Sequence, residues 1–143
     1  MSHNITIEKM RPEDVPAVVD LQRLLMPIEL TDAQITARYE KILANDDYAL
    51  LIARMDGAPV ATATAICCHA LAEDFLAIED VVVKDGLTGQ GIGGMLMDAA
   101  DDFARIKGCA YAILVSSGFR KDAHRFYEKH GYEEDVRGFR KSY

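Results

Sequence analysis

One stretch, residues 78–107, limits the possible folds of this chain more than any other part of it. Residues 75–83, which lead into it, combine β-branched and aromatic side chains at a density typical of a buried strand. A turn and a glycine-rich segment follow, and apolar residues then recur at helical spacing up to Gly108, a residue type that often ends helices. The recurring residues are Ile92, Leu96, Ala99, Phe103 and Ile106. The stretch predicts a strand, a glycine-rich turn and a helix in direct succession.

This succession is suited to holding an anion. The first N–H groups of a helix have no partner within the helix, and the helix dipole adds partial positive charge there. Glycines allow a phosphate to approach the backbone without a Cβ in the way. We therefore expect a phosphate-binding backbone segment, which consists of Thr88, Gly89, Gln90, Gly91, Ile92, Gly93 and Gly94.

Two other glycine-rich phosphate sites fit the segment poorly. A P-loop requires Lys-Ser or Lys-Thr after its last glycine, and neither follows Gly94. Gly89, Gly91 and Gly94 do satisfy the G-x-G-x-x-G fingerprint of dinucleotide-binding folds. That fold also needs an acidic residue about twenty positions further on and more βα units. Residues 111–115 contain no acid, and too little chain remains.

A third pattern fits both halves of the C-terminal region. The order V-x-V, turn, G-x-G-I-G and helix resembles motif A of the GCN5-related N-acetyltransferase (GNAT) family, and residues 123–132, AHRFYEKHGY, resemble its A-x-x-F-Y-x-x-x-G-F/Y signature. The run IEDVVV at residues 78–83 is similar to that of glucosamine-phosphate-type acetyltransferases. One position departs from the family pattern, because Thr88 stands where Arg or Gln is usual.

The remaining elements agree with this resemblance in order and length. Strands are expected near residues 5–8 and at 48–54, 58–67, 75–83, 110–115 and 134–143. A first helix is expected from Pro12 to just before Pro27, with Leu24 facing inward. A second helix is expected from Thr31 to Leu43, opened by a capping box of Thr31 and Gln34. Two further helices are expected over 92–107 and 121–130. Residues 110–115 are expected as a buried central strand. The order predicts one α/β (α+β) domain over residues 1–143, with a mixed, largely antiparallel sheet, a central parallel βαβ unit and helices on both faces.

Two adjacent carboxylates interrupt the most apolar strand. Because successive strand residues point to opposite faces, Glu79 or Asp80 should face the core or a cleft unless a bulge intervenes. Such a carboxylate is either one half of a buried ion pair or a functional group. In the resembled family the position of Glu79 lies beside the acceptor. We expect Glu79, with Asp80 as second choice, to be the general base for an ammonium acceptor, directly or through a water.

The resemblance implies further roles. The second aromatic residue of the Phe126–Tyr127 pair would place its hydroxyl near the coenzyme sulfur and act as a general acid to the departing thiolate. Backbone groups of the strand ending at Val83 would pair with the pantetheine arm of acetyl-CoA like an added strand. The expected coenzyme contacts outside the glycine-rich segment are Val81, Val82, Val83, Ser117, Arg120, Ala123 and Phe126.

Composition excludes several other classes. A formal net charge of −7 argues against a nucleic-acid surface and mildly favours cationic partners. The three cysteines lack metal-like spacing, which suggests reduced thiols. The sequence also shows no leader and no apolar run long enough to span a bilayer. Together these features predict a cytoplasmic protein that does not enter a membrane. The spacing of His69, His124 and His130 does not suggest a metal site, so no metal is expected. Residues 136–143 present an apolar and aromatic face that could pair between two copies, which predicts a homodimer.

The resemblance therefore implies acetyl transfer from acetyl-CoA to a primary amine by direct attack in a ternary complex, since no nucleophile is evident. The acceptor would be a small-molecule amine or a protein amine. The alternative from another class is a non-catalytic module that binds coenzyme A for regulation.

Overall fold

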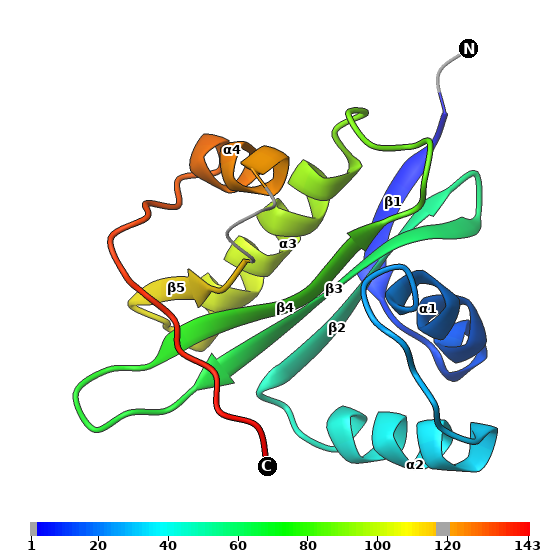
Figure 1. The fold of residues 1–143 in the computed structure, drawn as a ribbon, viewed down its shortest axis with the longest axis horizontal. Coiled ribbons are helices and arrows are strands. Elements are labelled where there is room, and N and C mark those ends of the chain that lie inside the picture. The colour runs from blue at the N-terminus through cyan, green and yellow to red at the C-terminus, as the bar shows by residue number, and fades with distance from the viewer. Residues whose placement is uncertain (1–2, 117–120) are drawn as a thin grey trace. The chain divides into compact units, whose positions relative to one another are not determined.

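The computed structural model describes residues 3–116 and 121–143. The chain forms two compact units, Met1–Ile113 and Leu114–Tyr143, which are described separately below. The first unit holds β1 (Ile5–Lys9), the short 3-10 helix η1 (Pro12–Asp14), α1 (Val15–Gln22), α2 (Asp32–Leu43), β2 (Tyr48–Met55), β3 (Ala58–Cys68), β4 (Phe75–Val83), α3 (Ile92–Lys107) and most of β5 (Tyr111–Leu114) (Figure 1). The second unit contains α4 (Lys121–Lys129).

Five strands form one sheet in the order β1-β2-β3-β4-β5. The first four pair antiparallel with their sequence neighbours, and β4 is connected through α3 to β5, whose arrow points the same way in Figure 1. The β2–β3 hairpin turns at Asp56 and Gly57, which have φ angles of 51° and 90°. Positive φ at both central residues is what the tightest hairpin turns require. The expected mixed, largely antiparallel fold is confirmed.

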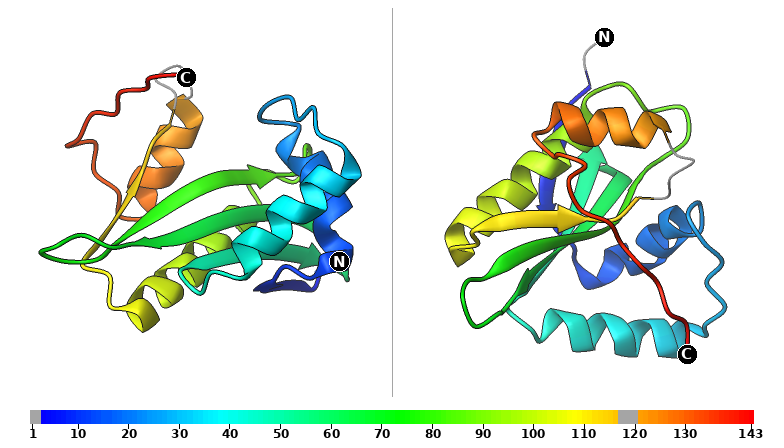
Figure 2. Two further views of the ribbon diagram at one scale, coloured as in Figure 1. Left: turned by 90° about the horizontal axis from the view of Figure 1, so that it is seen from below. Right: turned by 60° about the vertical axis from the view of Figure 1, so that its left-hand side comes forward.

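Both faces of this sheet are covered by helices. Ile52 and Ala53, which point to opposite faces of β2, are both fully buried. On the face of Ile52, Val18 from α1 and Tyr39 from α2 join a buried cluster. α3 lies along β2, β3 and β4. The right-hand view in Figure 2 shows α3 on one side of the sheet and α1 and α2 on the other.

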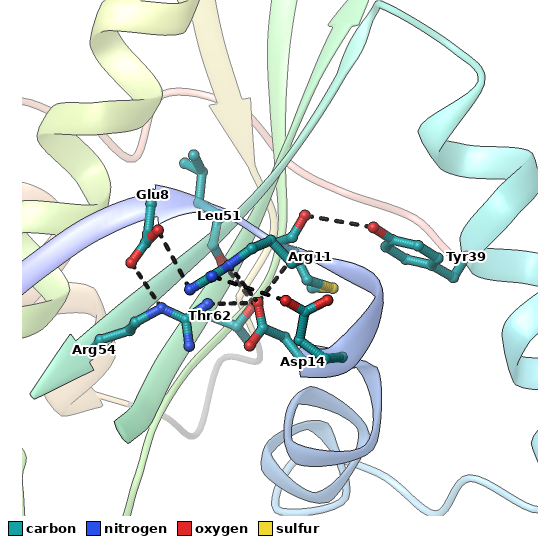
Figure 3. Close-up of polar contacts among 9 residues, drawn as sticks. Glu8, Arg11, Asp14, Tyr39, Leu51, Arg54 and Thr62 are labelled. Atoms are coloured by element: carbon teal, nitrogen blue, oxygen red, sulfur yellow. Dashed lines mark hydrogen bonds and ion pairs between the residues drawn. The ribbon is translucent and has the colours of Figure 1, made fainter. Parts of the chain in front are cut away.

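A buried ion-pair network lies beneath α1. The Arg54 guanidinium donates from Nε to Glu8 Oε1 at 2.7 Å and from Nη2 to Asp14 Oδ2 at 2.5 Å (Figure 3). Asp14 also accepts from the backbone N–H of Arg11 at 2.8 Å, which closes the turn that opens α1. Burial alone would raise the pKa of Asp14, but the hydrogen bonds from Arg54 and Arg11 and their charges outweigh it and lower the pKa. The network joins β1, β2 and the start of α1.

In the first two helices the structure differs in part from the expectation. α1 ends at Gln22, five residues before Pro27, because the N–H groups of Leu24 and Leu25 bond to carbonyls three residues back rather than four. This tighter winding rotates Leu24 out of the expected apolar stripe, and it is exposed. In α2 the predicted capping box of Thr31 and Gln34 is confirmed.

Two apolar residues at the ends of helices, Leu43 and Ile106, are also exposed, although the helical spacing of apolar residues predicts an inward Ile106. Leu43 is the last residue of α2, where the chain turns toward β2. In α3 the buried residues are Ile92, Leu96, Met97 and Ala100, and a repeat of 3.6 residues carries this face to Lys107 rather than Ile106.

The C-terminal strand expectations are wrong in two respects. β5 stands at the end of the described strand order and not in the middle of the sheet, and Tyr111 is exposed. Residues 134–143 form no strand in the structure, and Phe139 and Tyr143 are fully exposed. A strand needs a partner for its backbone groups, and none of the described residues pairs with this tail.

No helix within the described ranges is both long and apolar enough to cross a bilayer.

Candidate active site

The start of α3 has the geometry that the glycine-rich segment predicts. Gly91 is the N-cap residue with φ 81° and ψ 2°, and Gly89 also has a positive φ of 83°. An L-residue would be strained in this left-handed conformation. A Cβ built at either glycine would lie more than 4 Å from every described residue beyond its chain neighbours, which leaves room for a ligand as far as the structure describes the chain.

The electrostatics of this helix start favour an anion. Gly91 supplies no side-chain cap, and the first turn of α3 contains no acidic residue. The N–H groups of Ile92, Gly93 and Gly94 belong to the first turn, where a helix offers them no acceptor. Arg105 and Lys107 lie in the last turn, where they complement the negative end of the dipole. The positive end of α3 is therefore left without a counter-charge from its own first turn.

Before this helix, β4 carries a bulge at the paired carboxylates. Thr62 of β3 pairs with Val82, whereas Thr64 pairs with Glu79, so β4 has one more residue than β3 between these pairs. Asp80 has a φ of 54°, in the left-handed region where Asp and Asn are tolerated. The bulge breaks the strict alternation of side chains between the two faces of the sheet. The expectation from the sequence had allowed for such a bulge at Glu79 and Asp80.

The bulge gives Glu79 and Asp80 different surroundings. Glu79 is exposed and lies opposite Thr64, on the face of the sheet that α1 and α2 cover. Although the residue is exposed, partial desolvation of its carboxyl raises the pKa of Glu79, and the nearby charge of Asp80 raises it further. Asp80 is partly buried, and this burial raises its pKa as well. Neither carboxylate forms an ion pair with a cation among the described residues.

The end of β4 extends beyond its neighbour β5. The Ala110 N–H donates to the Asp74 carbonyl at 2.8 Å, and the rings of Phe75 and Tyr111 stack with centroids 5.3 Å apart, so the two strands start side by side. β5 has four residues and β4 has nine. β5 therefore ends before the part of β4 that holds Val81, Val82 and Val83. Of these three, Val82 is buried and the other two are partly buried.

The predicted aromatic pair lies in the second unit. In α4 the rings of Phe126 and Tyr127 meet edge to face with centroids 5.3 Å apart, and Tyr127 meets Tyr132 in the same way at 6.1 Å. The centroid of the Phe126 ring also lies 4.7 Å from the centroid of the His130 ring. Ala123 is one turn before Phe126 on the same helix. These contacts make the aromatic motif a small cluster that fixes the rings of the pair.

The structure thus brings part of the predicted site together. Glu79, Asp80 and Val81–Val83 stand on β4, and residues 88–94 follow them directly into α3 within the first unit. Ala123, Phe126 and Tyr127 stand together on α4 in the second unit. Ser117 and Arg120 lie outside the described residues. Sequence reasoning did not identify Thr64 as the cross-strand neighbour of Glu79, because strand pairing is needed to find it.

The chain was compared with families of known proteins. The profile of the acetyltransferase (GNAT) family matches residues 15–132. An uncharacterised N-acetyltransferase of Bacillus subtilis, YhdJ, is 42% identical over 69 residues, or 48% of this chain and 49% of that protein. The aminoalkylphosphonate N-acetyltransferase of Salmonella typhimurium is 37% identical over 65 residues, or 46% of this chain and 42% of that protein. The chain thus matches about half the length of these curated relatives.

A solved structure agrees with the fold over nearly the whole chain. The glucosamine-6-phosphate N-acetyltransferase of Arabidopsis thaliana superposes with a TM-score of 0.88 and 24% identity, covering 98% of this chain and 99% of that one. At this identity the likeness concerns the fold alone.

Proposed function

Because the chain belongs to the acetyltransferase (GNAT) family, we propose that it transfers an acetyl group from acetyl-CoA to a primary amine. The observation that carries this proposal is the start of α3, which offers a glycine-lined, acid-free set of backbone N–H groups directly after the carboxylates of β4. A diphosphate group fits there because it needs donors and partial positive charge rather than a specific side chain. Thr88, in place of the usual Arg or Gln, leaves this task mainly to the backbone.

The rest of the coenzyme would lie along β4. The backbone groups of Val81 and Val83 are candidates for pairing with the amides of the pantetheine arm, as an added strand would. The shortness of β5 supports this, because it leaves the end of β4 free of that neighbour. Val82, Ala123, Phe126, Ser117 and Arg120 are further proposed contacts. Acetyl-CoA supplies the activated acyl group, and no metal is needed for this step.

Proton transfer would be divided between two side chains. Glu79 accepts the proton that the ammonium acceptor must lose before its nitrogen can form the amide bond, directly or through a water. Its raised pKa makes it a stronger base than an ordinary carboxylate. Tyr127 donates its hydroxyl proton, or a hydrogen bond, to the thiolate released when the C–S bond breaks. Asp80 is the second candidate for the base.

We infer a small-molecule amine as the first acceptor to test, with a protein amine as the other class. The name of the Salmonella relative, an aminoalkylphosphonate N-acetyltransferase, supports the first class. The net charge of −7 favours the encounter of acceptors that carry extra positive charge. We further propose a single domain over residues 1–143, a cytoplasmic location in keeping with three free cysteines, a homodimer, and no nucleic-acid or membrane partner.

The release of coenzyme A thiol tests this function. Purified protein is incubated with acetyl-CoA and a panel of amines: an aminoalkylphosphonate, an amino-sugar phosphate, a polyamine, an aminoglycoside and a peptide with a free amine. We expect saturable thiol release with at least one amine and an acetylated product of the matching mass. Binding of acetyl-CoA by calorimetry without release for any amine would favour the non-catalytic module instead.

A further inference from the structure

A second group of polar side chains gathers around the start of β2 and the end of β3, away from the carboxylates of β4. Antiparallel pairing sets Tyr48 opposite Ile66, so the preceding Asp47 comes to lie beside Cys67. The Cys67 N–H donates to the Asp47 carbonyl at 2.7 Å. His69 follows directly after β3. The pairing thus brings Asp47 together with Cys67 and with His69, which lies twenty-two residues further along the chain.

The ligand atoms of this group lie close to one another. One atom each from Asp47, Cys67 and His69 falls within 4.8 Å of the other two. His69 Nε2 is 2.9 Å from Asp47 Oδ2, while its Nδ1 is 2.9 Å from Asp74 Oδ1. A carboxylate that holds one ring nitrogen of a histidine and turns the other toward the site is a common supporting arrangement for metal-binding histidines.

A second thiol lies at the edge of the group. Cys109 Sγ is 3.7 Å from Cys67 Sγ. Two thiolates that share one tetrahedral zinc ion, each at about 2.3 Å, are roughly 3.8 Å apart. The spacing of the two sulfurs therefore suits a shared ion. Cys109 falls outside the group whose ligand atoms all lie within 4.8 Å of one another, so its side chain would join as a fourth ligand by shifting toward Asp47 and His69.

We propose that Asp47, Cys67 and His69, completed by Cys109, form a binding site for a zinc-type divalent transition metal ion. The thiol and imidazole donors select zinc-type ions over Mg²⁺ or Ca²⁺, which prefer oxygen ligands. Cys67 is only 3% exposed, whereas the His69 side chain is 60% exposed, so the ion has a route from solvent. Coordination releases the thiol protons to solvent, because thiolates are the ligating form.

This site departs from the expectation of no metal, since strand pairing and not sequence spacing assembles it. One nearby charge opposes a cation: Lys107 Nζ is 3.6 Å from Asp47 Oδ1. An ion must compete with Lys107 and with His69 for the oxygens of Asp47. The ion would connect the starts of β2 and β5 to the end of β3, so its effect would be on stability rather than on the proposed acetyl transfer.

The test uses Co²⁺ as a coloured substitute for Zn²⁺ on the full chain, kept reduced with a phosphine. We expect one equivalent of Co²⁺ to bind, with a sulfur-to-cobalt charge-transfer absorption in the near ultraviolet and visible bands of tetrahedral intensity. Zn²⁺ should then displace Co²⁺ and raise the melting temperature. Absence of the charge-transfer absorption, or binding without one-to-one stoichiometry, would overturn the proposal.

Variants assign the ligands. His69→Ala changes an exposed side chain and should weaken Co²⁺ binding at least tenfold, and Asp74→Asn should weaken it about 10–100-fold through the support of His69. Cys67→Ser should reduce the sulfur absorption by at least half, because Cys67 is one of the two proposed thiolate ligands. Lys107→Met should tighten binding, because it removes the opposing charge.

Two matched variants serve as controls. Cys68→Ser alters the neighbouring thiol, whose Sγ contacts the Ile66 carbonyl, and His3→Ala alters an exposed histidine paired with Asp56. Both should bind Co²⁺ like the parent protein. If His69→Ala, which leaves the core untouched, also binds like the parent, the site is not the one proposed here, whatever happens to the folding of Cys67→Ser.

Discussion

At the scale of single residues, the bulge in β4 is the feature with the most chemical consequence. It separates the environments of Glu79 and Asp80, so that one carboxylate is exposed beside Thr64 and the other is partly buried. Both have raised pKa values, chiefly because of partial desolvation, and neither forms an ion pair within the part of the chain that the structure describes. Two carboxylates with raised pKa values at a strand irregularity, and without an ion-pair partner, support the proposal that they belong to the functional site.

The proposed base predicts a defined pH dependence. A base works only when deprotonated, so the wild-type rate should fall as the pH falls through the raised pKa of Glu79. Glu79→Gln should lose about a hundredfold to ten-thousandfold in rate between that pKa and the pKa of the amine. Above the pKa of the amine the difference should narrow, because solution supplies neutral amine. A pH–rate profile of kcat/KM with one accepted amine measures this.

Asp80→Asn provides the comparison, since Asn also tolerates the φ of 54°. If Glu79 is the base, Asp80→Asn should keep the shape of the wild-type profile. If instead Glu79→Gln keeps that profile and Asp80→Asn loses it, the base is Asp80.

Tyr127 is predicted to act mainly in the transition state. Tyr127→Phe should lower kcat and kcat/KM together while leaving acetyl-CoA affinity nearly unchanged, because the hydroxyl serves the thiolate only as it departs. Steady-state kinetics and calorimetry separate the two effects. Tyr132→Phe removes a hydroxyl from the adjacent ring of the same cluster and should leave kcat unchanged. Full turnover by Tyr127→Phe would reduce this tyrosine to a packing role.

Arg54 is predicted to be a major determinant of stability. Arg54→Met removes the cation closest to the buried carboxylate of Asp14 and leaves only the more distant Arg11, which should cost about 3–5 kcal/mol in the free energy of unfolding. The lowered pKa of Asp14 means that its contribution is present above the ordinary value of 3.8 and is lost as the pH falls. The difference between variant and parent should therefore shrink in acid.

Urea unfolding at neutral and acidic pH measures this difference. Arg23→Met is the matched control, because Arg23 pairs with Asp20 at 3.0 Å on the surface and should contribute less than about 1 kcal/mol. Equal losses in the free energy of unfolding for Arg54→Met and Arg23→Met would contradict the role assigned to the buried network.

At the scale of elements, α3 carries the coenzyme proposal. Gly91→Asp should weaken acetyl-CoA binding roughly tenfold or more, because a carboxylate a few ångströms from a phosphate costs about 1–4 kcal/mol. The substitution also strains a φ of 81°, so a control with the same strain is needed. Gly57→Asp provides it, with a φ of 90° and open space in the β2–β3 turn.

Calorimetric titration of each glycine variant with acetyl-CoA measures its affinity for the coenzyme. Gly57→Asp should lose stability but keep its affinity. Unchanged affinity in a folded Gly91→Asp protein would remove the start of α3 from the coenzyme site.

At the scale of the whole molecule, the exposed C-terminal tail supports the expectation of a homodimer. Val136, Phe139 and Tyr143 are apolar or aromatic and exposed, and no described residue pairs with the tail backbone as a strand. Light scattering at micromolar concentration should give about twice the chain mass of 15.8 kDa. Phe139→Ser should shift the mass toward the monomer, whereas Thr36→Ser on the exposed face of α2 should not. A monomeric parent protein would refute the expectation.

The sequence by itself determined the local elements of this protein. The strand at Phe75–Val83, the helix between Gly91 and Gly108 and the capping box at Thr31 were all readable, since hydrophobic period, glycine and capping chemistry act over a few neighbouring residues. The tight hairpin at Asp56–Gly57 was readable for the same reason. The family resemblance was also readable, because its motifs are short and continuous.

Only the tertiary structure decided what depends on strands meeting from distant parts of the chain. The bulge that separates Glu79 from Asp80 exists in the register between β3 and β4, and it has no signature in β4 alone. The pairing of β2 with β3 likewise sets Asp47 beside Cys67. The tail at residues 134–143 alternates like a strand but forms none, because alternation describes one strand while its hydrogen bonds require a second.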